Sequence, residues 1–394
     1  MQIELNRQRL YFADWLRISA FGLLVLYHVG MYYVPWGFHI KHQPTYAALE
    51  PWMRLTNPWR MSLLFVVSGL ATGLMLGRGG LAGARAKRLL LPLLFGMAVV
   101  VPPQAWWQVQ EQFGYAGSYL DFLRLYFSGY HGFCKGSDCL RLPTWNHLWF
   151  LPYLWCYTVV LLAAWRWLPR TVLSKLADHA AGLAGWRLLV WPLVFYGLSR
   201  ALLLPRFSET HALWGDWYAH ATYLAMFGWG VLLTRRQVLL DRLQALRWPA
   251  LLAAVVAWVA LTAYFAIVGT WVEVPELAKL PMRFVFATQQ WCAMVAAFGF
   301  GRMHLNRDHP WRAPLTEAVF PLYILHQTLI IGAAVALRPC ALPAGLEALL
   351  LIAITFGGAL LAWRVARRLT WLRPWMGMAA LPTRAAPALS AASS

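Results

Sequence analysis

The sequence predicts an all-α integral membrane protein, a polytopic bundle of about ten transmembrane helices with both termini in the cytoplasm. Hydrophobic residues make up 60% of the 394 positions and charged residues only 12%, whereas a soluble domain carries about 25% charged residues. The mean hydropathy is +0.51. The 24 tryptophans are typical of a chain that meets the membrane–water interface repeatedly. Membrane lipid is therefore expected around most of the chain.

The formal net charge of +19 does not indicate a nucleic-acid partner. Lysines and arginines lie in short segments between apolar stretches, and no soluble basic domain or basic run is present. Membrane insertion with positively charged inner loops produces this distribution. We therefore expect no nucleic acid among the partners.

Ten apolar segments are long enough to cross a membrane. At a rise of 1.5 Å per residue, each one can span a hydrocarbon core of about 30 Å, the shorter ones with little tilt. In chain order they cover residues 15–36, 59–76, 89–107, 147–168, 188–204, 218–234, 249–268, 284–301, 316–336 and 346–363.

The distribution of basic residues predicts the orientation. Ten spans leave both termini on the same side. With the N-terminus inside, the inner segments hold 23 of the 34 lysines and arginines and the outer segments hold 11, so the positive-inside rule favours cytoplasmic termini. No signal-peptide cleavage site follows the first nine residues. Residues 1–372 are expected to form one membrane domain, and the Ala/Pro/Ser-rich residues 373–394 a disordered cytoplasmic tail.

Two of the five cysteines, Cys134 and Cys139, lie close together in the longest predicted outer loop, residues 108–146. An extracytoplasmic loop permits a disulfide between them, and the sequence leaves its formation open. Two thiols do not complete the tetrahedral ligand set of a zinc site. No metal site is expected here or elsewhere.

The first span carries two ionisable residues, Arg17 and His28. Such groups are costly in a membrane, by roughly 2.5–3.5 kcal/mol for an arginine on insertion scales, and they often mark functional sites. Their separation of eleven residues is about 16 Å along a helix and close to three turns, so both point to one face. An imidazole has the intrinsic pKa of a general base. The alternative is that Arg17 reaches the membrane surface and His28 forms a structural hydrogen bond.

The second span and the inner segment after it contribute further candidates. Ser68 and Gly69 are small residues that permit close helix contact. Arg85 and Arg88 are three residues apart and hence adjacent on a helix face, where they could hold phosphate groups. Ordinary positive-inside charge explains these two arginines equally well.

The fourth and ninth spans also carry polar groups. A histidine beside tryptophans at the start of the fourth span is often only an interfacial anchor, but three polar residues at mid-membrane in the ninth favour function. Together these spans predict a chamber with a cationic inner mouth and an outer mouth that admits a hydroxyl-bearing substrate. The residues are Asn146, His147 and Trp149 in the fourth span, and Tyr323, His326 and Gln327 in the ninth.

Five motifs in order carry a family resemblance. They are the Arg-x10-His of Arg17 and His28, "FVVSGL" at 65–70, the Arg-x-x-Arg of Arg85 and Arg88, "HLWFLPYL" at 147–154 and "PLYILHQTLI" at 321–330. With them the chain resembles acyltransferase family 3, the integral-membrane acyltransferases. It looks most like the glucan-modifying branch typified by glucan biosynthesis protein C. The soluble hydrolase-like domain that many members append is missing from this sequence.

The resemblance implies an O-acyltransferase in the inner membrane of a bacterium. The donor would be a cytoplasmic acyl-CoA (acetyl or succinyl) acting as co-substrate, with no permanently bound cofactor. The acceptor would be a hydroxyl of an extracytoplasmic carbohydrate such as a glucan or exopolysaccharide, and glycan-synthesis proteins could be partners. The roles implied are catalytic for His28 and His326, donor binding for Arg17, Arg85 and Arg88, and chamber or acceptor binding for Asn146, His147, Trp149, Tyr323, Gln327 and Ser68.

Other mechanisms and functions stay open at this point. Direct transfer ranks before a covalent acyl-enzyme on a histidine, Ser68 or Tyr323, because no nucleophile–base pair is visible in the sequence. Polar groups at mid-membrane also mark transport paths, so a transporter or flippase for a glycan or lipid-linked sugar is the alternative. A non-catalytic partner of a glycan synthase is a third reading. A succinyl donor would need an additional cation that the sequence does not identify.

Overall fold

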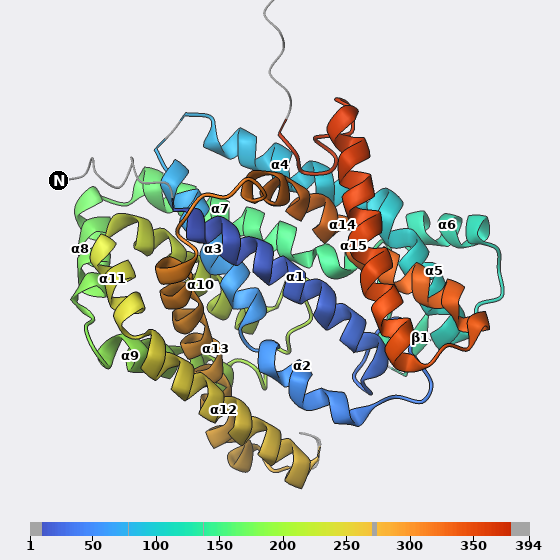
Figure 1. The fold of residues 1–394 in the computed structure, drawn as a ribbon, viewed down its shortest axis with the longest axis horizontal. Coiled ribbons are helices and arrows are strands. Elements are labelled where there is room, and N and C mark those ends of the chain that lie inside the picture. Colours follow the sequence, from blue (N-terminus) through green and yellow to red (C-terminus); the bar gives the residue numbers. More distant parts are fainter. Residues whose placement is uncertain (1–9, 78, 137, 270–273, 380–394) are drawn as a thin grey trace, which may run out of the picture.

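The structure, a computed structural model, describes residues 10–77, 79–136, 138–269 and 274–379. Helices make up 76% of it, which confirms the all-α class, and the strands within the described residues are the two-residue β1 (Cys134–Lys135) and β2 (Asp138–Cys139). Figure 1 shows the long helices packed side by side, with α1 near the middle of the bundle.

Fifteen α-helices are assigned in the described residues. They are α1 (Tyr11–Tyr33), α2 (Glu50–Thr56), α3 (Arg60–Met75), α4 (Leu81–Phe95), α5 (Val101–Phe113), α6 (Tyr119–Ser128), α7 (Phe150–Trp167), α8 (Arg170–Gly182), α9 (Arg187–Leu202), α10 (Trp217–Arg235), α11 (Gln237–Ala245), α12 (Arg247–Val268), α13 (Glu276–His304), α14 (Arg312–Leu337) and α15 (Ala344–Arg368).

All ten predicted segments fall on helices, and eight helical stretches in the described part are long and apolar enough to cross a membrane. The fifth and sixth segments correspond to α9 and α10. Helix α9 meets the criterion only together with α8, from which it bends by 113°, and α10 does not meet it. The architecture is thus that of a multi-pass membrane protein, with eight candidate spans in the described residues, or nine if the bent pair is one. The count of ten and the side of the termini remain predictions.

The third predicted segment, 89–107, is longer in the structure. Helices α4 and α5 and the π-helical turn Gly96–Val100 between them form one span over Leu81–Phe113. Hydropathy underestimates this length because the last turns carry Gln104, Gln108 and Gln112 on one side, and a helix continues past the point where its sequence stops being apolar.

Close approach of helix backbones fixes the centre of the bundle. Helix α3 packs along α10, and a side chain added at Gly69 would collide with the backbone carbonyl of Phe227. The reciprocal glycine, Gly230, faces the carbonyl of Val66 in the same way. The predicted use of a small residue at position 69 is therefore what lets these two helices touch.

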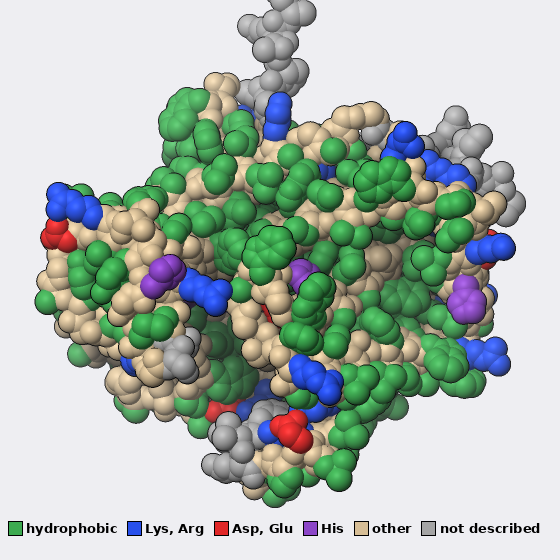
Figure 2. Space-filling view, turned by 180° about the vertical axis from the view of Figure 1, so that it is seen from behind, with side chains coloured by type: hydrophobic (Ala, Val, Ile, Leu, Met, Phe, Trp, Pro, Cys, Tyr) green, Lys and Arg blue, Asp and Glu red, His purple; other side chains and the backbone are tan. Residues whose placement is uncertain are grey.

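The surface agrees with a lipid environment. Figure 2 shows hydrophobic side chains over much of the face seen there. On α12, Leu252, Val256 and Val259 are more than half exposed. Exposed apolar area of this extent on a soluble monomer would be unusual, whereas in a membrane it faces acyl chains.

The loop and tail regions contain two further features. Cys134 and Cys139 form a disulfide that joins β1 to β2. Residues 373–379, the start of the predicted tail, are packed: Arg373 is buried and pairs with Glu317 at 2.8 Å, and Met376 is buried in the main core. Residues 380–394, the rest of that tail, lie outside the described residues.

Candidate active site

Three histidines that are far apart in the sequence meet in the bundle. His28 on α1 and His326 on the adjacent α14 place Nδ1 and Nε2, respectively, 3.2 Å apart. The ring of His147, in the 3-10 turn that precedes α7, lies 4.9 Å from the ring of His326 and perpendicular to it. Helix packing thus brings together the two histidines predicted to be catalytic and a third predicted to line the chamber.

The hydrogen-bond partners fix where the protons lie. His326 Nδ1 lies 2.7 Å from the carbonyl oxygen of Tyr323, which only accepts, so Nδ1 carries the proton and Nε2 is an acceptor. His28 Nδ1 faces that acceptor and also the carbonyl oxygen of Leu24, at 2.9 Å. His28 Nδ1 therefore carries its proton, and in the neutral ring the lone pair is on Nε2.

Hydrogen bonds of His147 connect α14 to the turn that precedes α7. Its Nε2 donates to the carbonyl of Ile324 at 2.9 Å, and its own carbonyl accepts a hydrogen bond from the hydroxyl of Tyr323 at 2.7 Å. Its Nδ1 is buried without a hydrogen-bond partner. Although the three histidines are neighbours, the described residues include no group of three His, Cys, Asp or Glu side chains arranged to hold a metal ion.

A cavity of about 380 Å³ lies beside His28. Among the predicted catalytic and chamber residues, Ser68 and His326 do not line it, and the three predicted donor arginines do not line it either. His326 is fully buried behind His28, and the Ser68 backbone carbonyl faces Arg85 instead. The predicted residues that do line the cavity are His28, Asn146, His147, Trp149, Tyr323 and Gln327.

An amide network forms the part of the wall near Gln327. Gln327 Nε2 donates to Gln104 Oε1 at 3.0 Å, and Asn146 Nδ2 donates to the same oxygen at 3.2 Å. Gln327 Nε2 also lies 2.6 Å from Nε2 of His39, whose Nδ1 lies 2.6 Å from Gln108 Oε1. Burial lowers the pKa of His39 below the usual 6.5, and the hydrogen bond with Gln108 opposes this shift in part.

Sequence reasoning missed Gln104 and His39. The available signal was the spacing of glutamines at 104, 108 and 112, which places three amides on one helix face. His39 lies in the connection between α1 and α2, where no periodic pattern predicts the direction of a side chain.

Two arginines in the cavity wall were also missed. Arg60, the first residue of α3, is 7% exposed, and its guanidinium lies 3.3 Å from the centre of the Tyr27 ring. Its Nε and Nη1 atoms are buried without hydrogen-bond partners. Arg200, at the end of α9, donates from Nη1 to the hydroxyl of Tyr218 at 2.6 Å. Both arginines adjoin predicted span ends, where basic residues are common and attract no functional interpretation.

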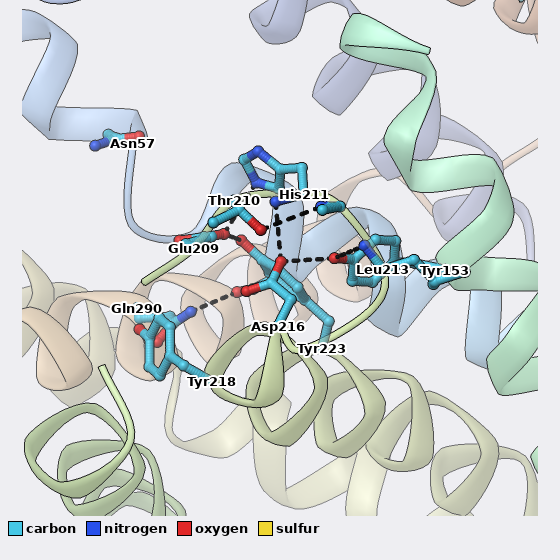
Figure 3. Close-up of polar contacts among 12 residues, drawn as sticks. Asn57, Tyr153, Glu209, Thr210, His211, Leu213, Asp216, Tyr218, Tyr223 and Gln290 are labelled. Atoms are coloured by element: carbon cyan, nitrogen blue, oxygen red, sulfur yellow. Dashed lines mark hydrogen bonds and ion pairs between the residues drawn. The ribbon is translucent and has the colours of Figure 1, made fainter. Parts of the chain in front are cut away.

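The connection between α9 and α10 contributes Glu209 and His211 to the cavity wall, and Figure 3 shows its polar contacts. Glu209 accepts a hydrogen bond from Tyr223 at 2.6 Å, and the ring of His211 stacks on Trp149 with 4.0 Å between centroids. The buried Asp216 anchors the loop, because its Oδ2 accepts from Tyr153 at 2.6 Å and from the His211 backbone at 2.9 Å.

Arg17, Arg85 and Arg88 gather near the other end of α1, and their positive charges repel one another. Asp14 pairs with Arg17 at 3.4 Å and is shared with Arg312 at 2.6 Å. Arg85 donates to the hydroxyl of Thr72 and, at 3.4 Å, to the Ser68 carbonyl. The predicted donor residues therefore form one cluster with excess positive charge.

Comparison with known proteins identifies the family of the chain. No curated protein and no solved structure is significantly similar to the chain. A family model described as an acyltransferase domain, that of acyltransferase family 3, matches residues 10–364. The match extends from the start of α1 almost to the end of α15 and includes every residue of the histidine cluster, the cavity wall and the arginine cluster discussed above. The chain therefore belongs to acyltransferase family 3.

Proposed function

We propose that this membrane acyltransferase transfers an acyl group from a cytoplasmic acyl-CoA to a hydroxyl of an extracytoplasmic carbohydrate, with His28 as general base. The observation that carries the proposal is the hydrogen-bonded pair His28–His326 beside a cavity. A base needs a free lone pair that faces the substrate and a second group that orients its ring. His28 lines the cavity, and His326 supplies the orientation from behind.

The chemical step follows from these proton positions. His28 Nε2 removes the proton of the acceptor hydroxyl while the hydroxyl oxygen attacks the carbonyl carbon of the thioester. The carbon–sulfur bond then breaks, and the imidazolium returns the proton to the departing thiolate, so that the products are an ester and free CoA. During the step His28 is positively charged, and its Nδ1–H bonds to Leu24 and His326 become charge-assisted.

The developing oxyanion requires hydrogen-bond donors. The hydroxyl proton of Tyr323 is committed to the His147 carbonyl, and the Gln327 amide faces Gln104 and His39. Arg60 has nitrogen atoms without protein partners, and its charge acts on His28. One of these nitrogens is thus better suited to oxyanion stabilisation than Tyr323 or Gln327, which leaves the other for a second anionic group of the ligand.

The cluster of Arg17, Arg85 and Arg88 would hold the phosphates of the donor. Guanidinium groups bind phosphate oxygens through charge-assisted hydrogen bonds. Arg17 and His28 are about 16 Å apart along α1, so an extended donor held at the cluster has to reach along the helix to bring its thioester to His28.

Charge in the cavity favours a succinyl over an acetyl donor. Arg60 and Arg200 both line it, and the carboxylate in the described lining, Glu209, is engaged by Tyr223 and His211. A buried guanidinium with unpaired nitrogens is costly unless a ligand supplies the acceptor. The free carboxylate of a succinyl group would be such an acceptor, so Arg60 is a candidate for the cation that the sequence left unassigned.

The acceptor and the cellular setting follow from the proposed reaction. Trp149 and several tyrosines in the cavity wall offer both apolar faces and polar edges, as a sugar needs. We place the protein in a bacterial inner membrane, with a glucan or exopolysaccharide as acceptor in the manner of the glucan biosynthesis protein C-like branch, and with glycan-synthesis proteins as partners.

The proposal is tested on glycans isolated from cells that lack the gene. These cells are complemented with wild type, with His28→Ala or with the surface control His179→Ala. Ester content is measured by NMR and mass spectrometry, with protein levels matched by immunoblot. Esters should appear with wild type and His179→Ala and be absent with His28→Ala. Unchanged esters throughout, with altered glycan amount or location, would favour the transporter or assembly alternatives.

The acyl preference is tested with the full chain in nanodiscs. Succinyl-CoA and butyryl-CoA have acyl chains of the same length and differ in the terminal carboxylate. Wild type should bind succinyl-CoA about tenfold or more tightly than butyryl-CoA, because a hydrogen-bonded charge pair contributes roughly 1.5–3 kcal/mol. Arg60→Gln should remove this difference, whereas Arg54→Gln, a control whose side chain pairs with Glu50, should retain it. Equal wild-type affinities would contradict a succinyl donor.

A further inference from the structure

A second and larger cavity, of about 930 Å³, lies at the end of α1 opposite to Arg17. Its volume is near the top of the ~300–1,000 Å³ range of small-molecule sites. The wall combines aromatic rings with polar groups. The residues that matter here are Tyr32, Tyr46, Trp107, Gln110, Glu111 and Glu347.

The two cavities share a wall. In the connection after α1, Phe38 and His39 line the His28 cavity, and the next four residues, 40–43, line the second. Likewise, Met31 lines the His28 cavity and the next residue, Tyr32, lines the second cavity. The Gln112 amide holds the wall in place through hydrogen bonds to the backbone carbonyls of Phe38 and His39, at 2.8 and 2.9 Å.

Charge in the second cavity is balanced. Arg338 pairs with Glu111 at 2.6 Å, and the Lys41 ammonium donates to the Met31 and Val34 carbonyls at 2.5 and 2.6 Å. Glu347 is 5% exposed and accepts from Tyr33 at 2.9 Å. The lining thus has no unpaired cation comparable with Arg60, so it offers an anionic ligand little attraction.

The chemistry of the wall matches a neutral, polyhydroxylated ligand. A sugar ring has an apolar C–H face and a hydroxyl edge. The Tyr46 and Trp107 rings can pack on the C–H face. Carboxylate oxygens and the Gln110 amide can form hydrogen bonds with the hydroxyl edge. A cavity of this volume has space for several sugar units, whereas the smaller His28 cavity must also admit the acyl donor.

We propose that the second cavity is a binding site for the neutral sugar units that flank the hydroxyl being acylated. This inference rests on the proposed function, because it makes the acceptor an oligomeric glycan whose reacting unit lies in the His28 cavity. Residues 38–43 form the divide over which the glycan passes. The site selects length and neutrality of the acceptor and takes no part in bond making or breaking.

The test is saturation-transfer NMR on the full chain in nanodiscs with neutral glucose heptasaccharides of α and β linkage. The double variant Tyr46→Ala/Gln110→Ala removes one ring face and one amide. Tyr130→Ala is the matched control, since Tyr130 is 40% exposed against 37% for Tyr46 and lines neither cavity. We expect at least one heptasaccharide to bind wild type and the control equally, and the double variant about tenfold more weakly.

Three results would overturn the inference: no neutral heptasaccharide binds wild type, the double variant binds as tightly as wild type, or a heptamer of hexuronic acid binds more tightly than the neutral sugar. Release of CoA thiol from acyl-CoA, measured in parallel with the heptasaccharide as acceptor, reports on the proposed function separately. Sugar binding that depends on Tyr46 and Gln110 without CoA release would support the site and contradict the acyltransfer.

Discussion

Replacement of His326 by leucine tests the division of roles between the two histidines. Leucine fills a similar volume in this fully buried position but accepts no hydrogen bond. If His28 is the base and His326 only orients it, His326→Leu should retain the base. It should lose one of the two hydrogen-bond acceptors that face His28 Nδ1, namely Nε2 of His326. The Leu24 carbonyl, at 2.9 Å, stays in place.

The size of the loss can be worked out from that contact. A neutral hydrogen bond contributes about 0.5–1.5 kcal/mol and one to a charged group about 1.5–3. The bond to His326 gains this difference, about 1–1.5 kcal/mol, when His28 becomes positively charged in the transition state. At 1.36 kcal/mol per factor of ten, kcat should fall about tenfold with little change in KM. Loss of the base itself in His28→Ala should cost about 10²- to 10⁴-fold.

The assay is acceptor-dependent release of CoA thiol by purified protein in nanodiscs, with thermal unfolding as the check on folding. His326→Gln, whose side-chain oxygen can accept a hydrogen bond, should recover part of the lost rate. Two outcomes would refute the reasoning: a folded His326→Leu protein as inactive as His28→Ala, which would give His326 a direct chemical role, or one as active as wild type.

Three further predictions concern the donor cluster, the cavity wall and the helix contacts. Arg85→Ala should raise the KM for acyl-CoA about tenfold or more through loss of a charge-assisted bond, whereas the exposed Arg364→Ala should not; equal KM values in steady-state kinetics would contradict a donor role. Because burial lowers the His39 pKa, the folded state favours the neutral ring. The contribution of His39 to the free energy of unfolding is therefore present above pH 6.5 and is lost as the pH falls through the lowered pKa. Melting temperatures at pH 7.5 and 5.0 should therefore differ less for His39→Gln than for wild type, and an equal pH dependence would contradict the contact. Gly230→Ala should cost about 1–3 kcal/mol by overpacking against α3, whereas Gly228→Ala, with no atom within 4 Å of the added carbon, should not destabilise; similar unfolding midpoints for the two variants would refute the close helix contact.

The sequence was most informative where a residue lies inside a regular helix. The separation of eleven positions from Arg17 to His28 determines their shared face once the segment is helical. The cluster of cations near Arg17 and the contact of His28 with His326 agree with that geometry. Small size at Gly69 likewise predicted a helix contact that the structure contains. Helical periodicity depends only on residues that are near one another in the sequence. It can therefore be predicted without knowing the tertiary structure.

The sequence was least informative where function depends on connections between helices. Arg60 and His39 lie at or near the loop between α1 and α3, and their importance arises only when that loop folds over the His28 cavity. Ser68 is a different case: it lies in a motif of the resemblance, its backbone carbonyl accepts a hydrogen bond from Arg85, and its side chain does not line the cavity. A motif marks a position as important without telling whether the side chain or the backbone is used.

The balance of charge along α1 gives the proposed reaction a direction. At one end, Arg17, Arg85 and Arg88 form a cationic cluster, and Asp14, which pairs with Arg17, is also bonded to Arg312. Near His28, Arg60 has no ion-pair partner among the described residues. At the far end, Arg338 pairs with Glu111, and the Lys41 ammonium donates to two backbone carbonyls. Unpaired charge attracts an anionic ligand, and paired charge does not. In the proposed reaction, a polyanionic acyl-CoA would be held at the first end while its acyl group reaches His28, and a neutral acceptor would gain nothing by moving toward the arginine cluster. The two substrates would then meet at His28, because each would be favoured on one side of it only.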